Sequence, residues 1–141
     1  MKRIAVIDGQ GGGIGSLIVK RLKEEFGDAI EIIALGTNST ATTAMMKARA
    51  NKGATGENAI ILNIKRSDYI VGPLSITFPN GMLGELTPKM AEAIVSSNAK
   101  KILLPLNQEG VEVICTEKEP LPHLIDRLIG VIKKLIQAED M

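Results

Sequence analysis

The sequence predicts a three-layer α/β fold around a mostly parallel β-sheet, and three observations favour it. Short apolar runs bounded by turn residues alternate with amphipathic helical patterns along the chain. Five of the fourteen glycines fall between positions 9 and 15, directly after the first apolar run. The length of 141 residues suits one domain, which would bury roughly two-thirds of its unfolded surface. We therefore expect a single domain over residues 1–141.

The first expected unit is a strand, a glycine turn and a helix. Residues 3–8 are predicted to form a buried parallel strand, because a short apolar run ends there in turn residues. Residues 30–35 form the second strand and complete a right-handed βαβ unit. The helix between them begins near Ser16 and ends before Gly27, a residue type that commonly terminates helices. Its apolar positions recur at helical spacing: Ile14, Leu17, Ile18, Leu22 and Phe26.

The middle of the chain continues the alternation. A helix is predicted over Thr40–Ala50, and another follows the glycine-containing loop at residues 74–87 and ends near Asn98. Residues 57–67 fit either a helix or a strand. A helix is favoured there, because residues 69–73 then supply the third strand of the alternation.

The last strands set the expected sheet order. A fourth strand is predicted over residues 101–106 and a fifth over Val111–Cys115. The residues between them are too few for a parallel crossover, so the fifth strand is expected to pair antiparallel with the fourth at an edge of the sheet, or to lie apart from it. The predicted order is 3-2-1-4 with the fifth strand outside it, where the third strand is residues 69–73.

The last helix, predicted over residues 122–138, has an apolar face broader than one buried stripe needs. Ile129 and Val131 are the surplus positions. Core packing is the favoured interpretation of these two positions, and a contact between two copies is the alternative. Because the apolar face is so broad and two-fold dimers are the commonest assembly, a homodimer through this helix is also predicted.

The glycine-rich turn is the predicted ligand site. Glycine accepts positive φ and lets the backbone approach a ligand, and the following helix offers unpaired N–H groups and a positive dipole end to an anion. The alternative is a turn that only lets the strand meet the helix closely. Five glycines exceed that need, since each costs roughly 0.5–1 kcal/mol of chain entropy. We predict a phosphorylated small molecule here, with a nucleotide or dinucleotide as the candidate cofactor. The predicted binding residues are Gly9, Gln10, Gly11, Gly12, Gly13, Ile14, Gly15, Thr37, Asn38 and Gly72.

The turn after the second strand is expected to complete that site. NAD-binding folds place an acid there to hold the ribose hydroxyls, but this turn contains none. Thr37 and Asn38 instead offer a hydroxyl and an amide at the carboxyl end of a strand. Ser39 and Thr40 fit the pocket or, equally well, a cap on the next helix.

A small enzyme is the alternative to a binding or regulatory module. Asp8 lies beside the expected phosphate site and could hold Mg²⁺ or act as a base, with Asn80, Glu85 or Asn107 as helpers. A turn carboxylate that accepts backbone N–H bonds is the favoured interpretation of Asp8. A third hypothesis is an oligomeric scaffold without a ligand.

Composition argues against several other classes. The net charge of +1, without a basic patch, and the three aromatic residues argue against a nucleic-acid partner. No apolar run predicts a membrane span, and no signal peptide is recognised, so we expect a cytoplasmic protein. One Cys and one His argue against a disulfide framework and a protein metal site.

The turn resembles one known motif. Gly9, three residues and then Gly13-Ile14-Gly15 follow the G-x-x-x-G-I-G pattern of short-chain dehydrogenases, which bind NAD or NADP. However, Asp8 stands where that family usually has Thr. The Tyr-x-x-x-Lys pair of that family is also missing, since Pro73 follows the sole tyrosine, Tyr69, at the lysine position. The resemblance therefore implies a similar strand-to-helix turn, but it does not make the chain a short-chain dehydrogenase.

A second resemblance covers nearly the whole chain. It is carried by residues 7–15 (IDGQGGGIG), 32–38 (IIALGTN), 53–60 (GATGENAI) and 102–108. Together they resemble a bacterial family of small Rossmann-like proteins that is catalogued as a domain of unknown function. The resemblance implies a Rossmann-like fold and a bacterial, cytoplasmic setting, and it carries no activity with it.

Overall fold

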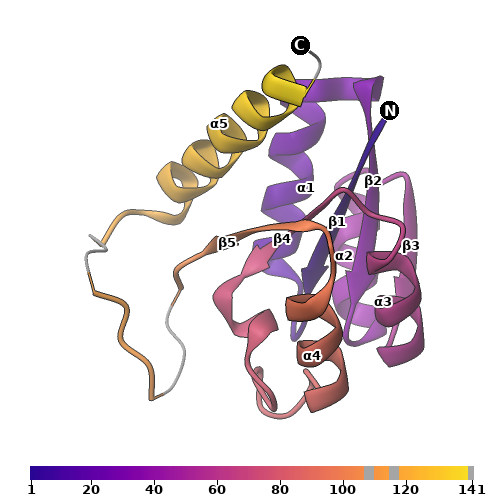
Figure 1. Cartoon of the computed structure of the whole chain (residues 1–141), viewed down its shortest axis with the longest axis vertical. Helices are drawn as coiled ribbons and strands as arrows, with labels where there is room; N and C mark the ends of the chain where they lie inside the picture. The colour runs from indigo at the N-terminus through magenta and orange to yellow at the C-terminus, as the bar shows by residue number, and fades with distance from the viewer. Residues whose placement is uncertain (107–109, 115–117, 140–141) are drawn as a thin grey trace.

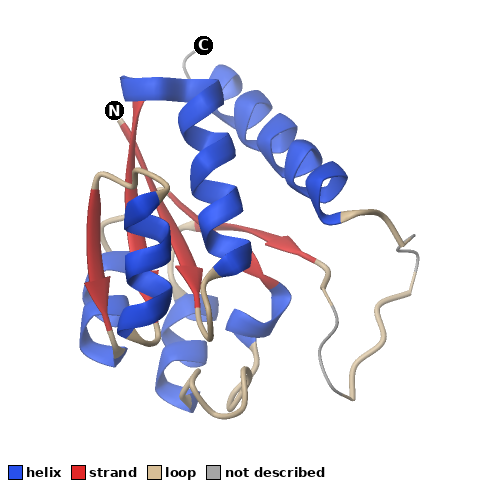
Figure 2. Ribbon diagram, turned by 180° about the vertical axis from the view of Figure 1, so that it is seen from behind, coloured by secondary structure: helices blue, strands red, loops and turns tan. Residues whose placement is uncertain are grey.

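The computed structural model describes residues 1–106, 110–114 and 118–139. Within these residues, parallel strands form one five-stranded sheet in the order β3-β2-β1-β4-β5, with helices on both faces (Figures 1 and 2). The strands are β1 (Lys2–Asp8), β2 (Ile30–Gly36), β3 (Lys52–Thr55), β4 (Tyr69–Pro73) and β5 (Lys100–Leu104). The helices are α1 (Gly13–Phe26), α2 (Ser39–Lys47), α3 (Glu57–Ile64), α4 (Pro88–Ser96) and α5 (Leu121–Glu139), with short 3₁₀ turns at Gly27–Ala29 and Leu74–Thr77.

The predicted three-layer α/β architecture is confirmed. Alternate residues of β1 face opposite sides of the sheet, because side chains alternate along a strand. Ile4 and Val6 pack with residues of α1, α2 and α5, whereas Ala5 and Ile7 pack with residues of α3 and α4. Helices cover both faces, which explains why the central strands are continuously apolar. The first strand is central, as predicted.

One strand was missed, and this changes the order of the others. β3 is short, lies at the sheet edge and exposes Lys52 and Gly53, so it has no apolar run that would predict a strand. It occupies the position beside β2 that was predicted for residues 69–73. Those residues form β4 and pair with β1 instead, and the strand predicted over 101–106 forms the edge strand β5.

The prediction of an antiparallel fifth strand over Val111–Cys115 is wrong. The fifth strand of the sheet is β5, which is parallel to β4 and is reached through α4. Beyond it, Val111 makes an isolated bridge, Val113 and Ile114 are exposed, and Cys115 lies outside the described residues. The described segment 110–114 runs away from the sheet (Figure 1). The apolar face of α5 packs against the α1 side of the sheet.

The helices largely follow their predicted ranges. Residues 57–64 form a helix, which decides the question that the sequence left open. Of the two surplus apolar positions predicted in α5, Ile129 is buried in the core and Val131 is 45% exposed. The homodimer stays a prediction. No helix in the described part of the chain is both long and apolar enough to cross a membrane.

Candidate functional site

The glycine turn lies at the point where the order of the strands in the sheet reverses. From β1 the chain winds through α1 and α2 towards β3 on one face, and through α3 and α4 it returns to β4 and β5 on the other. The carboxyl ends of β1 and β4 therefore flank the switch point, where open α/β sheets bind their ligands. The β1–α1 turn and the β4–α4 loop meet here.

Close packing explains some of the glycines of this turn. Gly12 has φ +75°, and a Cβ there would lie 2.7 Å from Ala41 Cα of α2. A Cβ on Gly15 would lie 2.7 Å from Met45 Sδ and 2.8 Å from Asp8 Cβ. These two glycines let α1 approach β1 and α2 closely, as the purely structural interpretation of the turn requires.

Gly11 and Gly13 are different. A Cβ at either position would meet no atom within 4 Å, and neither residue has a positive φ. Their backbone N–H groups, and that of Ile14, have no acceptor among the described residues. Packing of the strand against the helix does not require glycine at these two positions. They leave an open surface of unpaired N–H groups at the start of α1.

Asp8 holds the turn together. Its side chain is 4% exposed, and its Oδ1 and Oδ2 accept hydrogen bonds from the N–H groups of Gly9 (2.8 Å) and Gly15 (2.6 Å). Burial raises the pKa of Asp8, with a smaller contribution from the charge of Glu85, while the two backbone hydrogen bonds oppose the rise. This geometry fits the favoured interpretation of Asp8 as a turn carboxylate.

The raised pKa of Asp8 predicts a pH dependence of stability. The folded chain binds the Asp8 proton more tightly than the unfolded chain, whose value is near 3.8. The Asp8 contribution to the free energy of unfolding is therefore full below that value and is lost as pH rises through the folded pKa. The test compares Glu85→Gln with the Asp8→Asn/Glu85→Gln double variant in urea titrations at a series of pH values. We expect the difference in their free energies of unfolding to decline as pH rises through the folded pKa of Asp8. A difference that grew with pH would contradict the assignment.

Glu85 reaches the turn from the β4–α4 loop and is held by three donors. Its Oε1 accepts hydrogen bonds from the backbone N–H of Gln10 (2.9 Å), from Thr37 Oγ1 (2.7 Å) and from Asn38 Nδ2 (2.7 Å). The hydrogen bond from Gln10 is the main reason that the pKa of Glu85 is lowered, and burial opposes it. We call Gln10, Thr37 and Asn38 the donor cradle. It shows that this edge of the sheet presents converging donors to one anionic oxygen.

The loop that carries Glu85 has an unusual backbone. Asn80, Met82 and Leu83 all have φ between 58° and 65°, a left-handed conformation that costs a non-glycine residue roughly 1–2 kcal/mol. The base of the loop is anchored by the fully buried Leu86, whose carbonyl accepts a hydrogen bond from the Asn80 N–H at 2.8 Å. Leu83 at its tip is 91% exposed. Such conformations concentrate at functional sites.

The structure brings together most of the predicted site residues. Asn38 also caps α2, because its Oδ1 accepts from the Ala41 N–H at 2.8 Å; Ser39 and Thr40, the other candidate caps, lie within the helix. Asn80 is exposed and shapes the loop through its backbone, and Asn107 lies outside the described residues.

Two further residues at this edge have a packing role. Gly72 is buried in β4, where a Cβ would lie 2.5 Å from the Ile7 carbonyl oxygen. Met82 Sδ would lie 2.6 Å from a Cβ on Gly9, a contact that no signal in the sequence predicts.

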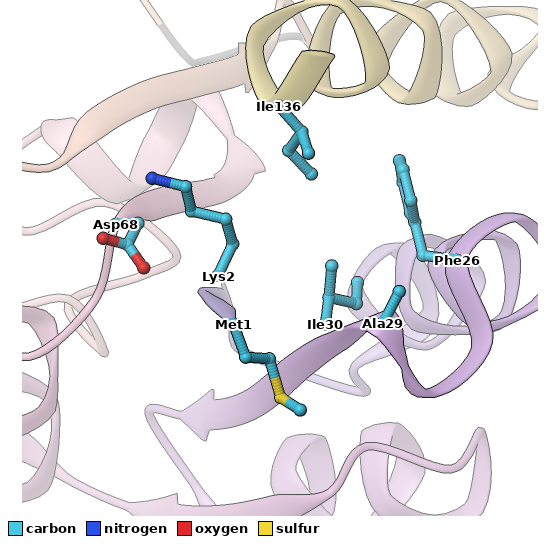
Figure 3. A pocket seen from close by; sticks show the side chains of 7 residues that line it. All are labelled: Met1, Lys2, Phe26, Ala29, Ile30, Asp68 and Ile136. Carbon is cyan, nitrogen blue, oxygen red and sulfur yellow. The ribbon is translucent and has the colours of Figure 1, made fainter. Parts of the chain in front are cut away.

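Two cavities lie elsewhere on the molecule. One of about 360 Å³ opens at the amino ends of the strands, the edge opposite the glycine turn (Figure 3), and is lined by Met1, Lys2, Phe26, Ala29, Ile30, Asp68 and Ile136. Its charged groups are already engaged, since Lys2 Nζ lies 2.6 Å from Glu139 and Asp68 accepts from the Arg3 N–H at 2.8 Å. The other, of about 330 Å³, lies between the ends of α3 and α4.

Among the described residues, no group of three or more His, Cys, Asp or Glu side chains gathers as metal ligands. The donors at the switch point are amides and a hydroxyl, which suit an anion better than a cation.

These features define a doubly wound, Rossmann-like α/β protein with a glycine-rich turn at its switch point. Residues 3–137 match the model of a family described as a domain of unknown function, DUF3842, and the chain belongs to this family. The resemblance found in the sequence is thereby confirmed.

Comparison with characterised proteins adds nothing about activity. No curated protein matches the sequence. A crystal structure of a probable oxidoreductase from Mycobacterium abscessus is similar, with 16% identity and a TM-score of 0.48. The match covers 77% of this chain but only 32% of that protein. At this level the likeness carries no conclusion about what the chain binds.

Proposed function

We propose that this protein is a binding or regulatory module that holds a phosphorylated small molecule, such as a nucleotide, at the glycine turn. The observation that carries the proposal is the donor cradle. Three donors from two strand ends converge on a single carboxylate oxygen of Glu85. A phosphate oxygen has the same charge-assisted chemistry as a carboxylate oxygen and would be recognised by the same groups.

The open part of the turn supports the same ligand class. The unpaired N–H groups of Gly11, Gly13 and Ile14 lie at the start of a 14-residue helix, whose dipole favours negative charge at that end. The absence of side chains at Gly11 and Gly13 leaves space for a phosphate group directly over these donors. Thr37 and Asn38 follow at the end of β2, where their side chains donate to the same anionic oxygen as the Gln10 N–H does.

The enzyme alternative has less support. Both carboxylate oxygens of Asp8 are engaged by backbone N–H groups in a buried setting. A general base needs access to a substrate proton, and a Mg²⁺ ligand needs an oxygen facing the ion. We therefore expect binding without a requirement for Mg²⁺.

A thermal-shift panel tests the proposal. A ligand at a hundredfold excess over its Kd stabilises the folded protein by about 2.7 kcal/mol. Nucleotides and dinucleotides should raise Tm, and the matching nucleosides should raise it much less, because they lack the phosphate. Running each ligand with and without Mg²⁺ separates the module from a metal-dependent enzyme. If no phosphorylated compound shifts Tm in either condition, the ligand-free scaffold becomes the leading hypothesis.

A further inference from the structure

The carboxylate of Glu85 occupies the donor cradle in the free protein. Gln10, Thr37 and Asn38 all donate to the same oxygen, so the cradle is already filled by an anion that belongs to the chain. A phosphate that used the cradle would have to replace this oxygen. Two anions on one set of donors would also repel each other.

The fold presents Glu85 from an anchored base. Leu86, the next residue, is fully buried, and its N–H donates to the Gly81 carbonyl at 3.1 Å. Glu85 itself is half-buried, and its carboxylate contacts the turn through the Gln10 N–H. Because the base is fixed by Leu86, the side chain can leave the cradle by rotating outwards while the loop keeps its anchor.

From this geometry we propose that Glu85 is an internal competitor that gates the anion site, and that a phosphorylated ligand binds by displacing its carboxylate from the donor cradle. The inference rests on the proposed function and adds a mode of regulation to it. In the free protein the cradle is closed. When the ligand arrives, the donors of Gln10, Thr37 and Asn38 pass from Glu85 to phosphate oxygens.

The gate has a quantitative consequence. The apparent affinity of a ligand is reduced by the fraction of molecules whose site is open. Removal of the carboxylate should therefore strengthen binding.

Titrations with inorganic phosphate, followed in ¹H–¹⁵N correlation spectra, test the gate. We expect the apparent Kd to fall at least tenfold in Glu85→Gln, and further in Glu85→Ala, which removes both the charge and the acceptor. Glu92→Gln on α4 makes the same change in net charge, and its carboxylate contacts Ser96 instead of the turn. This control variant should bind like the wild type.

The wild type gives a second readout that does not depend on any variant. The side-chain amide of Asn38 donates to Glu85 in the free protein, so its resonance should move as phosphate replaces the carboxylate. Equal or weaker binding in both Glu85 variants would overturn the gate while leaving the anion site intact. If no form of the protein binds phosphate, the anion site and the gate both fail.

Discussion

Gly12→Ala should destabilise the fold strongly, while the same change at the neighbouring Gly13 should not. The φ of +75° at Gly12 costs an alanine about 1–2 kcal/mol. Its Cβ would also lie 2.7 Å from Ala41 Cα, and such overpacking costs about 1–3 kcal/mol more. We expect a loss of about 2–5 kcal/mol in unfolding free energy, measured by chemical denaturation.

The matched control is Gly13→Ala, one residue further along the chain. Gly13 has no positive φ and faces open space, so alanine should leave stability unchanged or raise it by about 0.4–1 kcal/mol. Equal losses at both positions would mean that the turn does not have the conformation described here.

Gly13→Val should abolish binding of phosphorylated ligands while the protein stays folded. The valine side chain would project into the open space where we propose that the phosphate sits, and it would cover the N–H groups at the start of α1. We expect at least a tenfold loss of affinity for any nucleotide that stabilises the wild type, measured by calorimetry. A loss of about 1.4 kcal/mol in binding free energy corresponds to that factor.

Gly130→Val in α5 is the control for this variant. Gly130 also faces open space, but it lies on a helix far from the turn in sequence. It should keep the wild-type affinity. If Gly13→Val binds as tightly as Gly130→Val does, the ligand does not sit over the turn.

The first strand and helix could be predicted because their signals are local. An apolar run, a glycine cluster and helical periodicity all lie within residues 3–26, and the structure follows them closely. β3 lacked such signals. It is a four-residue edge strand whose position depends on pairing with β2 and on Gly53, where a Cβ would lie 2.7 Å from Met46 Sδ. The residues of the strand alone do not predict contacts of this kind.

The candidate site was predictable to a similar degree. Thr37 and Asn38 could be placed at it because parallel strands bring their carboxyl ends to one edge. The role of Glu85 could not be foreseen, since its partners Gln10 and Thr37 are 75 and 48 residues away in the sequence. Asn38 caps α2 in place of the expected Ser39 or Thr40, a shift of one or two residues that depends on where the first turn of the helix closes.

The most direct test of the account maps where a phosphorylated ligand binds. Titrating ADP into the ¹⁵N-labelled wild type should shift the backbone amide resonances of Gly11, Gly13 and Ile14 first and most strongly, together with those of Thr37 and Asn38. The account would be contradicted if these resonances stayed in place at saturating ADP. Shifts confined to Phe26, Ile30 and Ile136 would place the ligand in the cavity at the opposite edge of the sheet.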